Sequence, residues 1–424
     1  MKEQTLQEIL NQMIGYCLDH VRSTRTCRGL SDHDLIYLGM LRVLNRCSSG
    51  RDHFQWVEEN LDCEVATSTF FDALASERRS RMCADVSACL FTYLEKLIRQ
   101  ANGDCLQPLT DLQGYSIYAV DGTCMEHATH ATRVDGKYYP DNTVYIESLR
   151  TGLLAAALPL KDPDKKRPHE FPALRRAVER MAEQGPAPAF PKGTIIVADR
   201  AYINTAFWAQ ISRHRVYMIT RTKENMRPVK CAEIAFDRTD EDNAGVQHLF
   251  LVGGNSGYTH YVIDYTDPET HDTYQYMTSI DPTRIKPGVI VHLYRMRWQI
   301  ETTFNTIKRS LCQQKSWANS KAATTIQSHI ILMTHNFLRY LELVLEHDFD
   351  LVDRKVRNKA EKRLKKRRDN ASSIGRCLPP LLSKIPRITR LSLQFIRTVR
   401  NFICRNISLQ KLIPRFSKTY RAYR

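Results

Sequence analysis

The most specific spacing in the sequence lies in the segment YRMRWQIETTFNTIK, at positions 294–308. Read as an α-helix with about 100° per residue, this segment places four polar side chains within one arc of about 60°: Tyr294, Arg297, Glu301 and Lys308. A neighbouring arc is apolar, which predicts that this side of the helix is buried in the core. One acid, two bases and a phenol therefore project from one side of an anchored helix, which is the arrangement of a functional site.

A simpler interpretation is an exposed ion pair between Arg297 and Glu301, because residues four apart on a helix are neighbours. The full spacing Tyr-x2-Arg-x3-Glu-x6-Lys is more specific, since four fixed positions recur by chance in only about a few chains per thousand. It resembles the Tyr-Arg-Glu-Lys signature of bacterial insertion-sequence transposases of the insertion sequence four family. In that family the Glu is the third carboxylate of an Asp-Asp-Glu (DDE) triad, so the resemblance implies two Asp residues upstream, each at the end of a strand.

Two Asp residues upstream close predicted strands. SIYAVDGT predicts a strand at 117–120 that ends on Asp121, and KGTIIVADRAY predicts a buried strand at 194–198 that ends on Asp199. Either Asp could serve only as a turn residue or as the cap of the next helix. Together with Glu301 they indicate a shared site, and we expect the three carboxylates to converge within about 10 Å, as a two-metal site requires.

The motifs around both Asp residues extend the resemblance. DGT at Asp121 and ADRAY at Asp199 are similar to the first two catalytic motifs of the same family and follow the family's order. Arg200 and Tyr202 stand where the second motif has them, whereas Ala201 replaces the Gly or Glu that is common in the family. The resemblance covers roughly residues 110–340.

The chemistry that suits three carboxylates is metal-dependent phosphodiester cleavage. Two divalent cations roughly 4 Å apart can activate a water or a 3′-hydroxyl and stabilise the leaving oxygen. Oxygen ligands without Cys or His favour Mg2+ or Mn2+. We expect Asp121 to contact both ions, and Asp199 and Glu301 to complete one ion each.

Basic and aromatic residues beside the carboxylates are candidates for DNA binding. Arg297 and Lys308 suit phosphate contacts, a role that the resemblance also implies for them. Tyr294 could donate a hydrogen bond to a phosphate or stack on a base. Trp298 could stack on a displaced base, as in some family members, or be partly buried against a strand. Arg200, next to Asp199, completes the predicted DNA-binding set.

The charge of the chain is concentrated at its end. The segment 351–424 holds 22 Lys and Arg against 3 Asp and Glu, a net charge of +19, whereas the whole chain carries +16. Such a segment points first to nucleic acid and second to an anionic membrane surface. The 12 Cys include no CxxC pair, which argues against a zinc finger or a disulfide scaffold. No run of eighteen apolar residues is present, so we expect a soluble cytoplasmic protein that does not bind membranes.

The order of predicted elements indicates an α/β fold with helical flanks. Residues 1–105 read as a helical domain, in which helices over FQWVEENL (54–61) and ATSTFFDALASERR (66–79) could form a helix-turn-helix that binds DNA ends. Strands alternate with helices over 106–340, with a polar loop at 161–170, a helix at 171–184, and a small antiparallel β-rich insertion at about 221–290. A basic helical region follows at 341–424. The resemblance implies that the central part is a ribonuclease-H-like mixed-sheet core.

The function implied by the resemblance is a DDE transposase. Such an enzyme cuts double-stranded DNA at the terminal inverted repeats of a mobile element and transfers the ends to target DNA, with two Mg2+ or Mn2+ ions and a homodimer in the synaptic complex. A bacterial, nucleoid-associated location would follow. Two alternatives stay open: a metal-dependent nuclease of the same fold without strand transfer, and a DNA-binding repressor derived from a transposase.

The basic segment generates the first testable prediction. If 351–424 contacts DNA phosphates, its deletion weakens binding and flattens the dependence of log K on log salt by about 0.9 for each phosphate that the shortened chain no longer neutralises. Fluorescence anisotropy over a salt series measures both quantities. An unchanged slope after deletion removes the segment from the DNA interface.

Overall fold

The computed structural model describes most of the chain, with gaps. The described residues are 4–22, 25, 29–47, 49–61, 63, 65–131, 133, 136–160, 170–184, 190–226, 228–253, 259–349, 354–373, 393–408, 410–411 and 414. The predicted loop at 161–169 and much of the basic segment, including 374–392, lie outside them. No helix among the described residues is long and apolar enough to cross a membrane.

Five helices form the N-terminal region, as predicted for residues 1–105. They are α1 (Leu6–Asp19), α2 (Asp32–Asn45), α3 (Gly50–Asn60), α4 (Thr67–Leu74) and α5 (Glu77–Gln100). Polar residues before α1, α2, α3 and α5 accept hydrogen bonds from the free N–H groups of the first turn, as helix caps do. The predicted single helix at 66–79 is wrong, because α4 ends at Leu74 and the Ser76 side chain caps a new helix. DNA binding by this region stays a prediction.

The strands of the described residues join one nine-stranded mixed sheet. They are β1 (Ser116–Met125), β2 (Asp141–Ser148), β3 (Leu154–Pro159), β4 (Thr194–Ala198), β5 (Val216–Arg221), β6 (Val229–Glu233), β7 (Val246–Gly253), β8 (Thr259–Thr266) and β9 (Thr273–Thr278). Their order is β3-β2-β1-β4-β5-β9-β8-β7-β6. Strands β1, β4 and β5 are parallel, whereas β2 and β3 are antiparallel to their neighbours.

The β-rich insertion is present but is not a separate subdomain. Strands β6 to β9 are antiparallel to one another, as predicted. However, β9 pairs with β5 through Ile219 and Thr278, so the insertion extends the core sheet. Backbone hydrogen bonds therefore connect the insertion directly to the strands that carry the candidate site.

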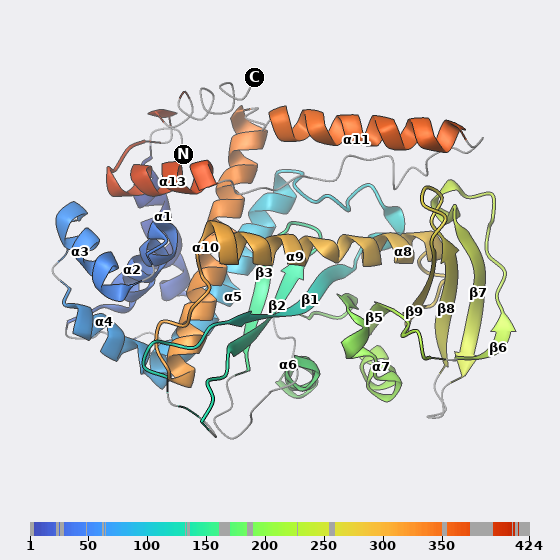
Figure 1. Ribbon diagram of the computed structural model, residues 1–424, viewed down its shortest axis with the longest axis horizontal. Coiled ribbons are helices and arrows are strands. Elements are labelled where there is room, and N and C mark those ends of the chain that lie inside the picture. The colour runs from blue at the N-terminus through green and yellow to red at the C-terminus, as the bar shows by residue number, and fades with distance from the viewer. Residues whose placement is uncertain are drawn as a thin grey trace.

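Helices cover both faces of the sheet. The remaining helices are α6 (Glu170–Gln184), α7 (Thr205–Ser212), α8 (Pro287–Met296), α9 (Trp298–Asn305), α10 (Lys321–Phe349), α11 (Arg354–Ser373) and α13 (Leu393–Cys404), with short turns η1 (Thr110–Leu112), η2 (Arg200–Tyr202), η3 (Glu241–Asn243) and η4 (Thr306–Ser310). Figure 1 shows α6 and α7 beneath the sheet and α8 and α9 across its other side. Helix α9 packs on β1 and α8 packs on β5, so the segment 294–308 lies over the centre of the sheet.

The segment 294–308 is not one regular helix, contrary to the prediction. Helix α8 ends at Met296, and the N–H of Arg297 donates to the Tyr294 carbonyl at 3.1 Å, which is a tighter turn than an α-helix makes. The chain then re-enters the helix as α9 and widens into a π-helical turn at η4. The angular arcs calculated from 100° per residue therefore shift at Arg297 and again before Lys308.

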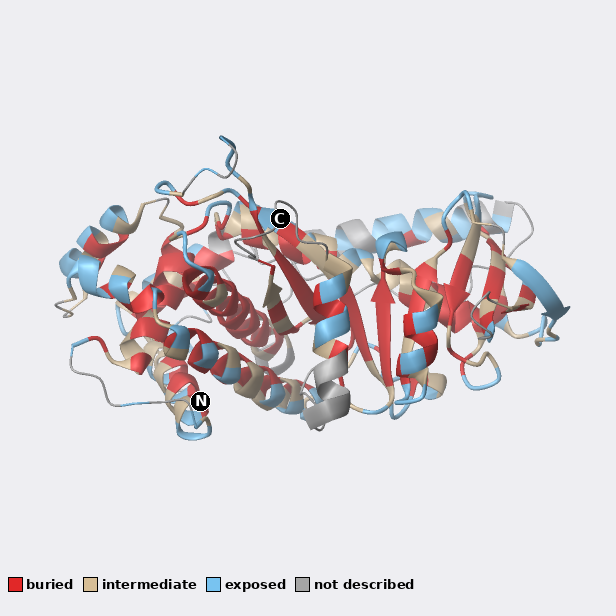
Figure 2. Ribbon diagram, turned by 90° about the horizontal axis from the view of Figure 1, so that it is seen from below, coloured by how far each residue is buried: buried red, intermediate tan, exposed pale blue. Residues whose placement is uncertain are grey.

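One continuous hydrophobic core includes residues from the N-terminal helices, the sheet and α13. Helix α10 packs against α2, α5 and β3, and α13 packs against α1 and α2. Figure 2 shows the buried central strands and helices, with exposed residues on the outer surfaces of the molecule. The division into three domains stays a prediction, but helices from both flanks share one core with the sheet.

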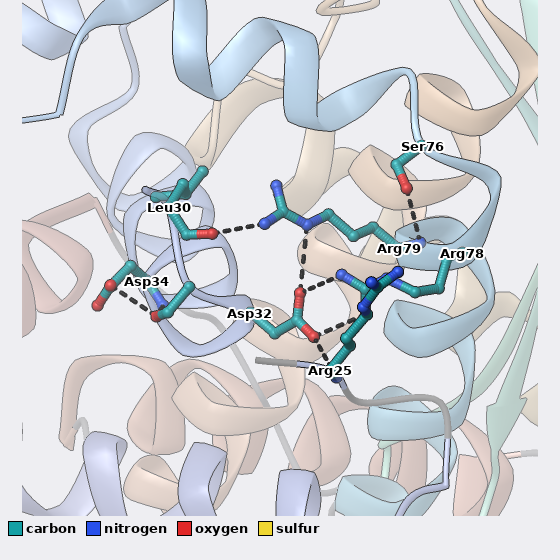
Figure 3. Close-up of polar contacts among 8 residues, drawn as sticks. Arg25, Leu30, Asp32, Asp34, Ser76, Arg78 and Arg79 are labelled. Carbon is teal, nitrogen blue, oxygen red and sulfur yellow. Dashed lines mark hydrogen bonds and ion pairs between the residues drawn. The ribbon is translucent and has the colours of Figure 1, made fainter. Parts of the chain in front are cut away.

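A buried ion cluster holds the start of α2 against α5 (Figure 3). Asp32 accepts two hydrogen bonds of 2.7 Å from Arg78 and one of 3.2 Å from Arg79 Nε. Arg79 also donates to the Leu30 carbonyl, and the Arg25 N–H donates to Asp32. Burial alone would raise the pKa of Asp32, but these hydrogen bonds and the two Arg charges together lower it. Asp32 is therefore ionised and neutralised in the fold.

Replacing Asp32 tests this cluster. Asp32→Ala leaves two Arg side chains without their acceptor and should lower the free energy of unfolding by roughly 3 kcal/mol. The folded pKa of Asp32 lies below its unfolded value, so its contribution is present at neutral pH and is lost as the pH falls below about 4. Thermal and denaturant unfolding at pH 7 and pH 3.5 measure both effects. Asp72→Ala, at an exposed position on α4, is the control and should change little.

Candidate active site

Two parallel strands bring Asp121 and Asp199 to one edge of the sheet. In the register of β1 and β4, Val120 pairs with Ala198, and the next residue on each strand is an Asp. Neighbouring strands lie about 4.8 Å apart, so these two side chains are neighbours. The carboxyl ends of parallel strands are the usual place for a site in an α/β sheet.

The prediction that β1 ends at Val120 is wrong in detail. Strand β1 continues to Met125 because β2 pairs with it on the other side, with Asp121 opposite Tyr145. Pairing with β4 ends at Val120, so Asp121 closes the parallel ladder while it stays inside the antiparallel one. Asp121 is therefore held on a continuous strand, whereas Asp199 follows the last residue of β4.

Asp199 keeps the capping role that was the simpler interpretation. Its side chain accepts the Ala201 N–H at 2.8 Å and caps the turn η2. Arg200 points to the exposed surface and forms an ion pair of 3.3 Å with Glu224. Tyr202 is fully buried. A cap and a functional carboxylate are compatible here, because the backbone bond leaves the second carboxylate oxygen available.

Arg297 joins the helix segment to the sheet edge. Its Nη1 donates to Asp121 Oδ2 at 3.0 Å, and its Nη2 donates to Glu301 Oε1 at 2.9 Å. The predicted pair with Glu301 is thus present, but it is not an exposed pair, because only 13% of the Arg297 side chain is accessible. One guanidinium brings two of the three candidate carboxylates together.

The electrostatics of Asp121 reflect this crowding. Burial raises its pKa, and the negative charges of Asp199 and Glu301 raise it further. The Gly122 N–H and the Arg297 charge act in the opposite direction, but the pKa of Asp121 stays above its ordinary value. A positive charge close to Asp121 would therefore stabilise its ionised form.

The other predicted residues lie around this group. The ring of Tyr294 stands 5.8 Å from the Arg297 guanidinium and 5.2 Å from the Tyr276 ring. Trp298 is 66% exposed, so the alternative of burial against a strand is wrong. Lys308 is half-buried on the π-helical turn. The roles of these residues, and of the three carboxylates as a metal site, stay predictions.

Glu170 also lies near this group, although the sequence did not indicate it. The sequence pattern placed this residue at the end of a polar loop, whereas Glu170 is the first residue of α6 and accepts a 3.0 Å hydrogen bond from the Tyr202 hydroxyl. The charges of Asp121 and Asp199 both raise its pKa, in addition to burial. An acid in the first turn of a helix is common, so nothing in the sequence distinguished Glu170 from an ordinary terminal residue.

The donor types fit Mg2+ or Mn2+, since all are carboxylate oxygens. Within the described residues, however, no group of three or more His, Cys, Asp or Glu side chains is arranged to hold a metal ion. The Arg297 guanidinium stands between Asp121 and Glu301, where it supplies the positive charge itself.

The fold and this group of residues define an α/β protein with carboxylates gathered at the edge of a mixed sheet. The family model described as "Transposase DDE domain" matches residues 112–337, more than half of the chain, and the chain belongs to this family. It is also 27% identical over 189 residues to "Putative transposase y4zB" of Sinorhizobium fredii (strain NBRC 101917 / NGR234). That match covers 42% of this chain and 51% of the relative, so the chain spans about half the length of the curated protein it matches.

A solved structure can also be aligned with most of the chain. It is the cryo-EM structure of the piggyBac transposase synaptic complex with hairpin DNA, which aligns over 97% of this chain and 81% of that chain. The sequence identity is 11% and the TM-score is 0.36. A likeness this distant says nothing about the chemistry of the chain studied here.

Arg297→Ala tests the neutralising role of the guanidinium. Without it, Asp121 and Glu301 repel each other, and we expect the free energy of unfolding to fall by roughly 1–3 kcal/mol at pH 7.5. The loss of Arg297 raises the pKa of Asp121 further above its unfolded value, so protonation favours the folded variant. The deficit should therefore shrink as the pH falls toward about 5.

Denaturant unfolding of both proteins at pH 7.5 and pH 5 measures this effect. Arg284→Ala, which removes an exposed cation, is the matched control. A deficit that is equal at both pH values would contradict the electrostatic explanation and indicate poorer packing instead.

Proposed function

We propose that the chain is a DDE transposase of the insertion sequence four type, which cuts DNA at the ends of a mobile element and joins those ends to target DNA. The observation that carries the proposal is the arrangement of the DDE candidates. Strand register places Asp199 beside Asp121, and Arg297 ties Glu301 to Asp121. The match to the transposase DDE domain covers all three carboxylates.

A ribonuclease-H-like core is part of the same proposal. Strands β1, β4 and β5 are parallel, and β2 and β3 extend the sheet as an antiparallel hairpin on the β1 side. Helices lie on both faces. Glu301 reaches the sheet edge from α9, a helix that follows the β-rich extension in the chain but packs on β1.

Asp121, Asp199 and Glu301 would hold the divalent cations. When bound, two such ions activate an attacking water or 3′-hydroxyl and stabilise the leaving oxygen. Asp121 follows the β1–β4 pairing beside Asp199 and shares Arg297 with Glu301, which supports a role for it in holding both ions. The raised pKa of Asp121 supports this role, because an added positive charge at this position would be favourable.

Arg297 would link DNA binding to metal binding. In the structure its guanidinium neutralises Asp121 and Glu301. A DNA phosphate offers the same guanidinium an alternative partner, since Arg binds carboxylate and phosphate with the same fork geometry. If Arg297 turns to the phosphate, both carboxylates become available to cations. DNA ends and metal ions would therefore favour each other's binding.

The remaining contacts would position the DNA. Lys308 follows Glu301 on the same segment and suits a phosphate contact, and Tyr294 flanks Arg297. Exposed Trp298 offers an apolar face for stacking on a displaced base. Arg200, which follows Asp199 in the chain, adds an exposed cation near that carboxylate. A homodimer that pairs two element ends completes the proposal.

Basic helix α11 is a further DNA-binding candidate. Its exposed cations are Lys362, Arg363, Lys365, Lys366 and Arg368. Arg367 on the same helix donates to Glu269 at 2.7 Å, which holds α11 beside the β-rich extension. A helix fixed in this way presents its positive charge at a set position on the surface.

Glu301→Ala separates the enzyme from a DNA-binding repressor. Loss of a metal-binding carboxylate should reduce cleavage by on the order of 10²–10³-fold or more. Binding of an end fragment should survive, and tighten slightly, because one negative charge near the phosphates is gone. A gel shift and a Mg2+-dependent cleavage reaction on the same labelled end fragment measure both. Arg297→Ala and Lys308→Ala should instead weaken binding together with rate.

The outcomes distinguish the alternatives. Wild-type protein that binds the end fragment but does not cut it with any divalent metal favours the repressor. Cleavage without joining to target DNA favours the nuclease. A Glu301→Ala variant that cuts like the wild type would limit Glu301 to its ion pair with Arg297.

A further inference from the structure

A partly buried hydrogen bond connects α6 to the turn after Asp199. The Tyr202 hydroxyl donates to Glu170 Oε2 at 3.0 Å. Tyr202 has no exposed surface, and its backbone N–H donates to the Asp199 carbonyl at 3.2 Å. Tyr202 therefore connects the Glu170 carboxylate to the turn that follows Asp199.

The same carboxylate also lies against β1. A Cβ atom built on Gly122 would come closer than 3.0 Å to the Cδ and both oxygens of Glu170, a separation that real Cβ atoms essentially never show. Gly122 directly follows Asp121 in the strand. Glu170 therefore fills the space beside the first candidate carboxylate and binds the turn of the second.

Packing holds Glu170 in this place. The next residue of α6, Phe171, packs edge-on against Phe207 of α7, with ring centroids 5.4 Å apart. The Trp208 indole N–H of α7 donates to the Tyr202 carbonyl at 3.2 Å. Helices α6 and α7 therefore hold both partners of the Glu170–Tyr202 bond in position.

Among the described residues, no Lys or Arg pairs with the partly buried Glu170 carboxylate. Its one side-chain hydrogen bond within the described part of the chain comes from Tyr202. Burial and the charges of Asp121 and Asp199 make its ionised form unfavourable. Placing Glu170 beside Asp121 and Asp199 therefore lowers the stability of the fold. A role in the site explains the position of Glu170 better than packing alone.

We propose that Glu170 is a positioning residue that acts through Tyr202 and Gly122. Its carboxylate ties the turn after Asp199 to the strand segment after Asp121 and so sets the separation of these two side chains. The inference rests on the proposed function, because that separation matters only if both carboxylates act together. A displacement of about 1 Å in such a group can cost about 10²-fold in rate.

The test is a double-mutant cycle in the full chain with Glu170→Ala, Tyr202→Phe and the double variant. Both single variants remove the bond, and Tyr202→Phe keeps the ring. Glu170→Gln is the conservative variant, since its amide oxygen can still accept from the hydroxyl. Tyr274→Phe is the matched control, because it removes a hydroxyl that donates to Asp272 at 3.3 Å in the β-rich extension.

Three readouts are needed. Single-turnover cleavage of an end fragment at saturating Mg2+ measures rate, and a gel shift measures binding. Hydrogen–deuterium exchange of the unliganded protein over 119–125 and 199–204 measures positioning without any catalysis. We expect each single variant to lower the rate by about 10- to 100-fold and to speed exchange in both segments, with binding and the control unchanged.

The double variant should cleave no more slowly than the slower single variant, because both substitutions remove the same hydrogen bond. Glu170→Gln should keep the rate within about threefold of the wild type. Additive effects of the two substitutions, or a Glu170→Gln variant as slow as Glu170→Ala, would overturn the positioning role, the second by showing that the negative charge itself is required.

Failure of the proposed function gives a different pattern. If the wild type never cleaves DNA, the exchange data alone test whether Glu170 couples the two segments. Faster exchange in both segments, with no further increase in the double variant, supports the coupling of the two turns by Glu170. Unchanged exchange in the single variants overturns it.

Discussion

Repulsion among carboxylates is the constraint on which the centre of this molecule depends. The β1–β4 register fixes Asp121 and Asp199 side by side, and α9 adds Glu301 above them. Gathered negative charge at a partly buried edge is unfavourable unless a cation is close. Arg297 supplies that charge from the junction of α8 and α9 and bonds to two of the acids at once. The tight turn at Arg297 and its two ion pairs therefore act together to neutralise the carboxylates.

This arrangement explains why the fold around the site is so extensively connected. The sheet continues from β5 into β9, so the β-rich extension and the core strands share one hydrogen-bond ladder. Helix α10 packs against α5 on one side and β3 on the other, and α13 returns from the C-terminal region to α1 and α2. A site whose acids repel one another needs rigid supports, and one continuous core provides them.

The same charge balance suggests how the site would respond to its substrate. Arg297 pairs with the protein's own carboxylates in this structure. Under the proposed function, a DNA phosphate would compete with Asp121 and Glu301 for the same guanidinium. Glu170 instead accepts its hydrogen bond from Tyr202, which is fully buried. Under the two proposals, Arg297 would change partners, whereas Glu170 would hold the positions of Asp121 and Asp199.

Local patterns in the sequence determined much of this protein. The sequence predicted a helical region at residues 1–105, and the predicted strand at 194–198 matches the observed bounds of β4. The spacing around Glu301 and the strands before Asp121 and Asp199 indicated the candidate site. These features depend on residues close together in the chain, so they can be read without the fold.

Only the tertiary structure decided which groups meet. Arg297 bonds to Asp121, which lies 176 positions earlier in the chain. Glu170 lies against Gly122, although the sequence around Glu170 resembles an ordinary helix start. The joining of β9 to β5 and the continuation of β1 past Asp121 depend on partners elsewhere in the chain. Register, strand order and buried electrostatics arise from long-range packing, which no local pattern encodes.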